Sequence, residues 1–348
     1  MDTKRLPILY AILAAVCYGI SAPIAKLILS DLPPIMTAAM LYLGAGLGML
    51  AVNTFRGKRA RKIEARITRK ELPFTLAMIA LDIAAPVLLM LGLTRSAPAT
   101  VSLLGNFEIA VTTVLARAIF KEAVGRRMWL AIALITLASA ILSFDGTSKL
   151  TFSPGSVLVL LACICWGIEN NCTSKLAHKD PLQTVVVKGL CSGGISLLIA
   201  LASGERIVDF SFLSALLLGF AAYGLSIYLY ILAQRSLGAA RTSAYYAFAP
   251  FIGVALSLAM FREAPTLSFV AALAVMLAGA YLAAFERHSH AHTHVAELHE
   301  HRHSHDDGHH THSHDKHSTG DHSHAHTHSG ETHSHPHTPD LHHHHTHE

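Results

Sequence analysis

The segment Phe120-Lys121-Glu122-Ala123 recurs, nearly unchanged, as Phe261-Arg262-Glu263-Ala264. The two glutamates are 141 positions apart (263 minus 122), and each segment lies between two long apolar runs. Similar segments separated by matching apolar runs indicate an internal duplication. If each copy contains an odd number of membrane spans, the second enters the bilayer upside down relative to the first, which is the plan of many secondary transporters. The sequence therefore predicts an inverted-repeat membrane protein.

A second match lies near the other end of each copy. Cys17-Tyr18-Gly19-Ile20 resembles Cys165-Trp166-Gly167-Ile168 at a distance of 148 positions (165 minus 17). The offset between the two copies thus falls by seven residues, from 148 at this match to 141 at the glutamates. The simplest explanation is that the basic connector 56–71 is longer than its equivalent in the second copy. Five spans in each copy fit both matches. We therefore predict a first repeat over residues 1–145 and a second over residues 146–287.

Apolar runs long enough to cross a bilayer recur along both copies. Hydrophobic residues make up 52% of the whole chain, although its last 61 residues (288–348) are strongly polar. A membrane-spanning helix needs about 20 apolar residues. Ten runs meet this length: 7–29, 34–55, 72–93, 97–119, 127–144, 154–173, 182–203, 211–233, 240–260 and 267–285. The predicted fold class is an all-α integral membrane protein with ten transmembrane helices, arranged as two inverted five-helix repeats.

The connector 56–71 predicts the orientation of the chain in the membrane. Its basic residues are Arg56, Lys58, Arg59, Arg61, Lys62, Arg66, Arg69 and Lys70. Cytoplasmic loops of membrane proteins carry an excess of lysine and arginine. With this connector inside the cell, the N-terminus is also inside, and ten crossings return the C-terminus to the cytoplasm. The charge pattern also favours a bacterial inner membrane.

The last part of the chain, residues 288–348, has a different composition. It contains 25 of the 26 histidines, and it carries 2 Lys+Arg against 9 Asp+Glu. Neutral imidazole is a good ligand for Zn, Ni, Co and Cu. We therefore predict a cytoplasmic metal-binding tail that is disordered without metal, because it has too few apolar residues to pack. An expression tag and a pH-responsive polyelectrolyte are the alternatives. The alternating histidines predicted to bind metal are His288, His290, His292, His294, His301, His303, His305, His322, His324, His326 and His328.

Ionisable residues inside the predicted spans are candidates for the solute pathway, because a charge in the bilayer is costly unless it is paired or hydrated. Asp82 and Glu108 lie near the middle of their spans, and Glu169 and Lys188 lie at similar depths in theirs. The predicted pathway consists of Asp82, Glu108, Glu169, Asn170, Lys188, Tyr245 and Tyr246. One carboxylate would titrate to couple transport to protons. In the alternative, Glu169 and Lys188 only pin two helices together, and the tyrosines only pack.

The body resembles the drug/metabolite transporter superfamily, with two EamA-type halves. In that family each repeat closes with an acidic residue before its last helix, a position that Glu122 and Glu263 match. The family also carries a Glu-Pro-like pair in the preceding helix. In this chain the first repeat keeps only the acid, because Glu108 is followed by Ile109, and the second repeat keeps only the proline, in the aligned pair Ala249-Pro250. The resemblance covers residues 7–285. It implies two inverted five-helix bundles around a central cavity, and export or exchange of small solutes.

Three hypotheses of function remain. The first is a carrier that exports a small organic solute, such as an amino-acid-like metabolite or a metal chelator, while the tail senses or buffers metal. The second is a carrier whose cargo is the transition-metal ion itself. The third, less favoured because an anchor needs no duplication, is a membrane-bound metal store or sensor. The sequence contains no motif that indicates an enzyme, a required cofactor or nucleic-acid binding. The expected partners are the lipid bilayer and a small-molecule or metal substrate, with a homodimer as a possible assembly.

Overall fold

The computed structural model describes residues 6–55, 65–120, 124–143, 153–176, 179–207, 209–237, 242, 245–284, 288–293, 298–303, 322–327 and 332–337. In the first repeat the elements are α1 (Leu6–Gly19), α2 (Ser21–Ile28), α3 (Pro34–Phe55), η1 (Arg69–Glu71), α5 (Leu72–Thr94), α6 (Pro98–Leu104), α7 (Phe107–Phe120) and α8 (Arg126–Ser143). In the second they are α9 (Pro154–Ser174), α10 (Pro181–Ala202), α11 (Ser211–Gly219), η2 (Phe220–Leu225), α12 (Ser226–Leu237), α14 (Ala249–Phe261) and α15 (Leu267–Ala284).

These helices coincide with the predicted membrane spans. Eight continuous or slightly broken helices in the described part of the chain are long and apolar enough to cross a membrane, and α14 and α15 are shorter apolar helices. In the expected span 240–260 residues 245 and 246 are helical, Ala247 and Phe248 form a turn, and the continuous helix α14 begins at Ala249; residues 238–241 and 243–244 lie outside the described residues. Large apolar side chains cover the outer surface, as Leu198 (67% exposed) and Leu217 (70% exposed) illustrate. Such a surface is suited to lipid, and the prediction of an all-α membrane protein is confirmed.

Four of the expected helices are interrupted within the described residues, and one of these breaks is the turn at Ala247 and Phe248 that precedes α14. The span 7–29 is divided into α1 and α2 at Ile20, the span 97–119 into α6 and α7 at Gly105 and Asn106, and the span 211–233 contains the π-helical turn η2. Pro23 explains part of the first interruption, because proline has no N–H to donate to the carbonyl of Gly19. Apolar patterning alone did not predict these breaks.

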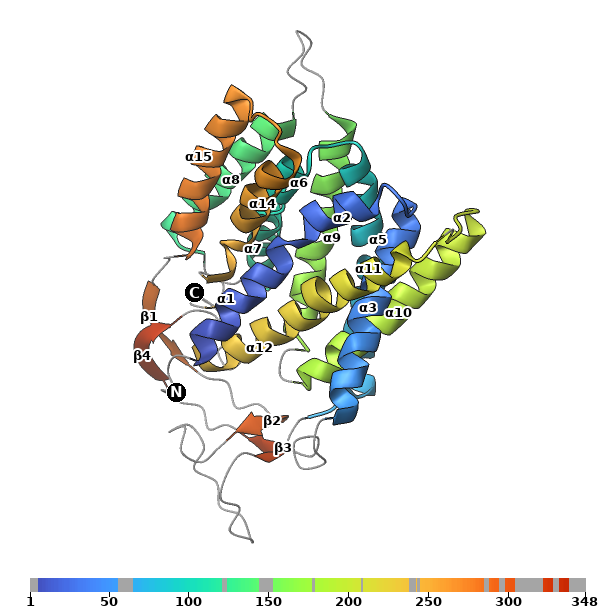
Figure 1. The fold of residues 1–348 in the computed structure, drawn as a ribbon. Helices are drawn as coiled ribbons and strands as arrows, with labels where there is room; N and C mark the ends of the chain where they lie inside the picture. Colours follow the sequence, from blue (N-terminus) through green and yellow to red (C-terminus); the bar gives the residue numbers. More distant parts are fainter. Residues whose placement is uncertain are drawn as a thin grey trace.

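Packing between the repeats follows a pseudo-two-fold axis. Corresponding spans of the two repeats contact each other: α3 packs on α10, α8 on α15, and α6, from the fourth span, on α14, from the ninth. The contact of α5 with α9 has its equivalent in the contact of α12 with α1. Figure 1 shows α1 and its counterpart α9 running in opposite directions, and it shows α1 beginning and α15 ending on the same side of the bundle. This arrangement is the inverted repeat that the duplicated sequence predicted.

Two glycines show the symmetry at atomic scale. A Cβ added at Gly46 would lie 2.5 Å from the backbone nitrogen of Leu190, and a Cβ at Gly193 would lie 2.5 Å from that of Leu43. Both pairs of residues are related by 147 positions (193 minus 46, and 190 minus 43). Helices α3 and α10 therefore cross in very close contact at equivalent points, a contact that only residues without a side chain permit.

Beyond α15 the structure describes four short strands, β1 (His288–Thr293), β2 (Leu298–His303), β3 (His322–Thr327) and β4 (Thr332–His337). Strand β1 pairs antiparallel with β4, and β2 pairs antiparallel with β3. These segments differ from the lack of regular structure expected for the tail, and their two-residue sequence alternation is compatible with an extended backbone. The rest of the tail lies outside the described residues.

Candidate functional site

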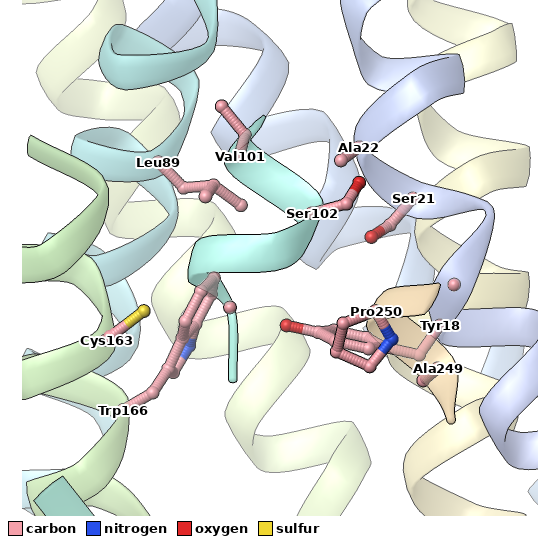
Figure 2. Close-up of a pocket in the computed structure, with 12 residues that line it drawn as sticks. Tyr18, Ser21, Ala22, Leu89, Val101, Ser102, Cys163, Trp166, Ala249 and Pro250 are labelled. Carbon is pink, nitrogen blue, oxygen red and sulfur yellow. The ribbon is translucent and has the colours of Figure 1, made fainter. Parts of the chain in front are cut away.

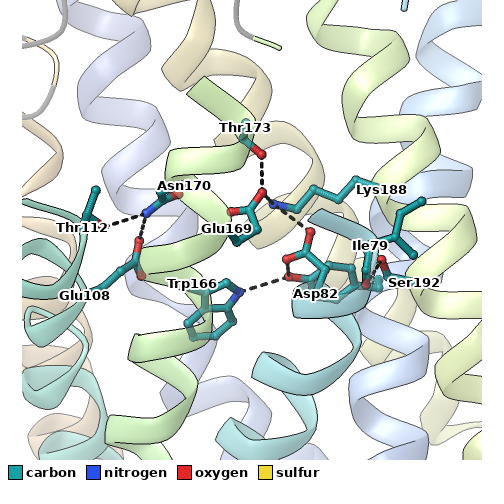
Figure 3. Close-up of polar contacts among 11 residues, drawn as sticks. Ile79, Asp82, Glu108, Thr112, Trp166, Glu169, Asn170, Thr173, Lys188 and Ser192 are labelled. Carbon is teal, nitrogen blue, oxygen red and sulfur yellow. Dashed lines mark hydrogen bonds and ion pairs between the residues drawn. The ribbon is translucent and has the colours of Figure 1, made fainter. Parts of the chain in front are cut away.

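Two buried carboxylates share one lysine inside the bundle. The Nζ atom of Lys188, on α10, lies 3.1 Å from Oδ2 of Asp82 on α5 and 3.0 Å from Oε1 of Glu169 on α9 (Figure 3). Asp82 is 0% exposed, Glu169 2% and Lys188 7%. The ion pair expected between Glu169 and Lys188 is present, and Asp82 completes it as a triad. The triad links helices of both repeats.

Neutral side chains hold the triad in place. The hydroxyl of Tyr42, on α3, donates a 2.8 Å hydrogen bond to Oδ1 of Asp82, and Nε1 of Trp166 donates to the Tyr42 oxygen at 3.3 Å. The hydroxyl of Thr173 donates to Glu169. Sequence reasoning missed these three residues as site residues, although Trp166 belongs to the repeated segment near the start of the second copy. Each carboxylate of the buried triad therefore has one neutral hydrogen-bond donor in addition to Lys188.

Glu108 forms a separate polar group on the other side of α9. The Nδ2 atom of Asn170 donates a 2.6 Å hydrogen bond to Oε1 of Glu108, and it lies 3.4 Å from Oγ1 of Thr112. Figure 3 shows that neighbouring residues of α9 point to opposite sides, Glu169 toward Lys188 and Asn170 toward Glu108. Within the described residues no lysine or arginine pairs with Glu108. Its carboxylate therefore has a neutral partner where Asp82 and Glu169 have a cation.

A cluster of tyrosine rings from α1, α3, η2, α12 and the segment just before α14 lies in the same part of the bundle. The ring of Tyr18 stacks on that of Tyr246 with centroids 5.7 Å apart, and it meets Tyr223 edge-on at 6.1 Å. Tyr223 also contacts Tyr42 at 5.5 Å, and Tyr246 contacts Tyr230 at 4.9 Å. The Glu108 carboxylate interacts electrostatically with the hydroxyls of Tyr18, Tyr223 and Tyr246. Glu108 and the tyrosine cluster therefore lie in the same region of the bundle interior.

The two tyrosines that the sequence singled out differ in placement. Tyr246 belongs to the ring cluster, and its hydroxyl lies 3.5 Å from that of Ser226. Tyr245 is half-buried next to it, and no contact in the described part of the chain joins it to either polar group. Of the predicted pathway residues, the structure thus assembles Asp82, Glu169 and Lys188 into one group and Glu108 and Asn170 into another, with Tyr246 beside the second.

A narrow pocket lies where the interrupted helices meet (Figure 2). Its lining comes from α1, α2, α5, α6, α9 and α14, and consists of Tyr18, Gly19, Ser21, Ala22, Leu89, Val101, Ser102, Gly105, Cys163, Trp166, Ala249 and Pro250. Next to it in sequence, Asn106 is 1% exposed, and neither polar atom of its side chain has a partner among the described residues. None of these residues was predicted as a site residue, because the pocket is created by helix breaks that hydropathy does not reveal.

The predicted metal site falls largely outside what the structure describes. His294, His305 and His328 lie outside the described residues, and the other tail histidines proposed as ligands are described only as parts of strand backbones. Among the described residues, no group of three or more histidine, cysteine, aspartate or glutamate side chains is arranged to hold a metal ion. Metal binding by the tail stays a prediction.

Comparison with known proteins identifies the family. The model of the EamA-like transporter family matches residues 5–144 and, a second time, residues 153–285. The chain belongs to the EamA-like transporter family. The two matches coincide with the two inverted repeats of the fold, and the resemblance to the drug/metabolite transporter superfamily inferred from the sequence is confirmed. Of the two family glutamates, Glu122 lies outside the described residues, while Glu263 is exposed between α14 and α15.

Individual relatives agree with membership of the EamA-like family. A curated protein of Methanothermobacter thermautotrophicus, described as an uncharacterized transporter, is 26% identical over 287 residues, which cover 78% of this chain and 84% of that protein. A solved structure described only as "Crystal structure of protein" has a TM-score of 0.59 at 16% identity and covers 80% of this chain and 95% of its own. This second likeness supports the fold alone. The EamA-like chain is therefore an integral membrane protein of a transporter family.

Proposed function

We propose that this chain is a secondary active carrier that exports a small organic solute with an ammonium group, such as an amino-acid-like metabolite or a metal chelator. The proposed setting is a bacterial inner membrane, with both chain ends in the cytoplasm. The observation that carries the proposal is the Glu108 carboxylate, which lies between the repeats and whose hydrogen-bond partner among the described residues is the neutral Asn170. A carboxylate that is buried away from water is costly unless a cation pairs with it, so such a site favours the binding of a cationic group.

The two polar groups of the site have different proposed roles, one in holding helices together and one in transport. Lys188 already neutralises one of the two carboxylates that hold it, and all three side chains are packed and hydrogen-bonded. Glu108 has no such counter-ion among the described residues, and tyrosine rings lie beside it. Aromatic faces attract ammonium groups. We therefore assign solute binding to Glu108 and the adjoining tyrosines, and we assign helix anchoring to the triad of Asp82, Glu169 and Lys188.

The test is transport by purified protein in proteoliposomes loaded with a panel of radiolabelled amines and amino acids. We expect Glu108→Gln to reduce the initial rate at least tenfold for any transported solute, because the amide keeps the shape but loses the charge. Glu263→Gln is the matched control, since that glutamate is exposed in a loop. Both variants should insert and elute as the unmodified protein does. Undiminished flux through folded Glu108→Gln would remove Glu108 from the mechanism.

Transition-metal efflux is a second candidate, and the observation in its favour is the concentration of 25 histidines in the last 61 residues. In this case the tail would collect ions at the cytoplasmic mouth and deliver them to the carrier. Truncation after Arg287 separates the two functions. If the tail regulates an organic-solute carrier, the truncated protein exports the solute normally and no longer responds to metal.

If the tail delivers cargo, truncation instead lowers the uptake of radiolabelled nickel or zinc into inverted vesicles, although the protein still inserts. Binding of either metal to the full chain in detergent, measured by isothermal calorimetry with the truncated chain as control, tests the predicted metal site separately. A full chain that binds no more metal than the truncated one would contradict the prediction for the tail.

A further inference from the structure

The pocket between the helix breaks is small and is lined by hydroxyl groups. Its volume is about 30 Å³, which holds one or two water molecules or one small ion. The three hydroxyls belong to Tyr18 on α1, Ser21 on α2 and Ser102 on α6, and Figure 2 shows these side chains reaching the pocket from their separate helices. Ser21 also interacts with the hydroxyl of Tyr223, but a hydroxyl oxygen has two lone pairs. The size and the lining therefore suit a small ligand that binds oxygen atoms.

A backbone carbonyl adds a fourth oxygen atom. Gly19 also lines the pocket, and its carbonyl has no helical N–H partner because the residue four positions later is Pro23. A Cβ added at Gly253 would lie 2.8 Å from this carbonyl oxygen and 2.7 Å from the Oγ atom of Ser102. The two oxygen atoms therefore border the same small space beside Gly253.

The lining offers oxygen atoms rather than N–H donors. The indole N–H of Trp166 donates to the hydroxyl of Tyr42, and Pro250 has no N–H to donate. Ser102 is 8% exposed, and its Oγ atom has no hydrogen-bond partner among the described residues. A buried polar atom without a partner is costly, so a ligand that contacts this oxygen removes a cost. Hard cations are bound by oxygen ligands of this kind.

A carboxylate near the pocket favours a cation over a neutral ligand. Glu108 follows the lining residue Gly105 by about one helical turn, and its N–H donates to the Gly105 carbonyl at 3.2 Å. Its carboxylate interacts electrostatically with Tyr18 and Cys163, which both line the pocket. In broken helices of transporters, freed backbone carbonyls commonly hold sodium ions. One carboxylate balances one positive charge, so the charge near the pocket suits a monovalent cation.

We propose that this pocket binds one sodium ion and that Glu108 supplies the balancing charge. The ligands are three hydroxyls and one carbonyl, from Tyr18, Ser21, Ser102 and Gly19. The small volume favours sodium over the larger potassium ion. In the carrier, sodium is then the ion exchanged for the solute, because sodium and the solute's ammonium group each balance Glu108 and exclude one another. This role in exchange rests on the function proposed above, whereas the binding site does not.

Equilibrium binding of radiolabelled sodium tests the site without transport. The purified full chain in detergent is measured by scintillation proximity, with choline chloride keeping the ionic strength constant. We expect saturable binding that unlabelled sodium chloride displaces. Potassium chloride at the same concentration should displace little of the label, because the pocket is too small for the larger ion.

Two serine variants test whether the ion lies in this pocket. Ser102→Ala should raise the Kd for sodium about three- to tenfold, the effect of one lost polar contact in a buried site. Ser139→Ala is the matched control, because Ser139 is also buried, on α8, has an unpartnered hydroxyl among the described residues, and does not line the pocket. It should leave the Kd unchanged.

Two further variants test the carbonyl and the charge. Pro23→Ala supplies an N–H that bonds to the Gly19 carbonyl, so it should also raise the Kd for sodium, although alanine favours the helix. Glu108→Gln removes the balancing charge and should raise the Kd about tenfold or more. The midpoint of thermal unfolding in detergent confirms that each variant is folded.

The sodium site is overturned if binding does not saturate, in which case the pocket holds water only. It is also overturned if potassium displaces sodium equally well, or if the two serine variants bind sodium alike. Saturable, Ser102-dependent binding in a protein without flux for any solute would retain the site and contradict the carrier. Glu108-dependent flux in a protein that binds no sodium would retain the carrier and contradict the site.

Discussion

At the scale of single residues, α9 shows what one sequence can and cannot predict. Glu169 and Lys188 were expected to pair because both lie at the same depth, and their atoms are 3.0 Å apart. Depth does not tell which way a helix is rotated, so the sequence could not show that Asp82 would join this pair or that Asn170 would point to Glu108. The role of Glu108 in transport stays a prediction.

The triad leads to a prediction about stability. Lys188→Met leaves Asp82 and Glu169 buried without their cation, and breaking a buried ion pair in this way costs about 3–5 kcal/mol. We expect a clearly lower midpoint of thermal unfolding in detergent. The triple variant Asp82→Asn, Glu169→Gln, Lys188→Met should recover much of this loss because it removes all three charges. A single Lys188→Met variant as stable as the unmodified chain would mean that the triad does not anchor the helices.

At the scale of elements, the apolar runs predicted the helices well and their interruptions not at all. A run of about 20 apolar residues defines a span by its length, so the bounds of α3 and α10 agree closely with the expected 34–55 and 182–203. Pro23 accounts in part for the break at Ile20, but the length of an apolar run records neither this break nor the one at Gly105 and Asn106. The pocket was missed for the same reason.

The crossing of α3 and α10 gives a prediction with an internal control. Gly193→Ala places a Cβ 2.5 Å from the backbone nitrogen of Leu43, which cannot move without separating the helices. We expect a loss of stability of about 1–3 kcal/mol, as for other overpacked positions. Gly194→Ala adds the same methyl group at a site with nothing within 4 Å, and it should be neutral or slightly stabilising because alanine favours helix. The midpoints of thermal unfolding of the two variants are compared. Equal midpoints would contradict the close crossing of α3 and α10.

At the scale of the whole molecule, the repeats share a backbone plan and differ in charge. By the sequence offsets between the repeats, the residue equivalent to Asp82 is Tyr223 (223 minus 82 is 141), and the residue equivalent to Glu169 is Ser21 (169 minus 21 is 148). The triad therefore has no charged equivalent across the pseudo-two-fold axis. Duplication explains the fold, and in the part of the chain that the structure describes the triad lies on one side of the pseudo-two-fold axis. The symmetry could be read from two short matches, whereas this asymmetry required the structure.

The inverted relation of the repeats is the claim on which the carrier depends, and labelling of two single cysteines tests it most directly. Lys70 and Ser203 are exposed and lie in equivalent connectors, between α3 and α5 and between α10 and α11. In a background with the five native cysteines replaced, a membrane-impermeant maleimide should label Lys70→Cys only from the cytoplasmic face and Ser203→Cys only from the opposite face. Labelling of both positions from the same face would contradict the inverted repeat and the transport function inferred from it.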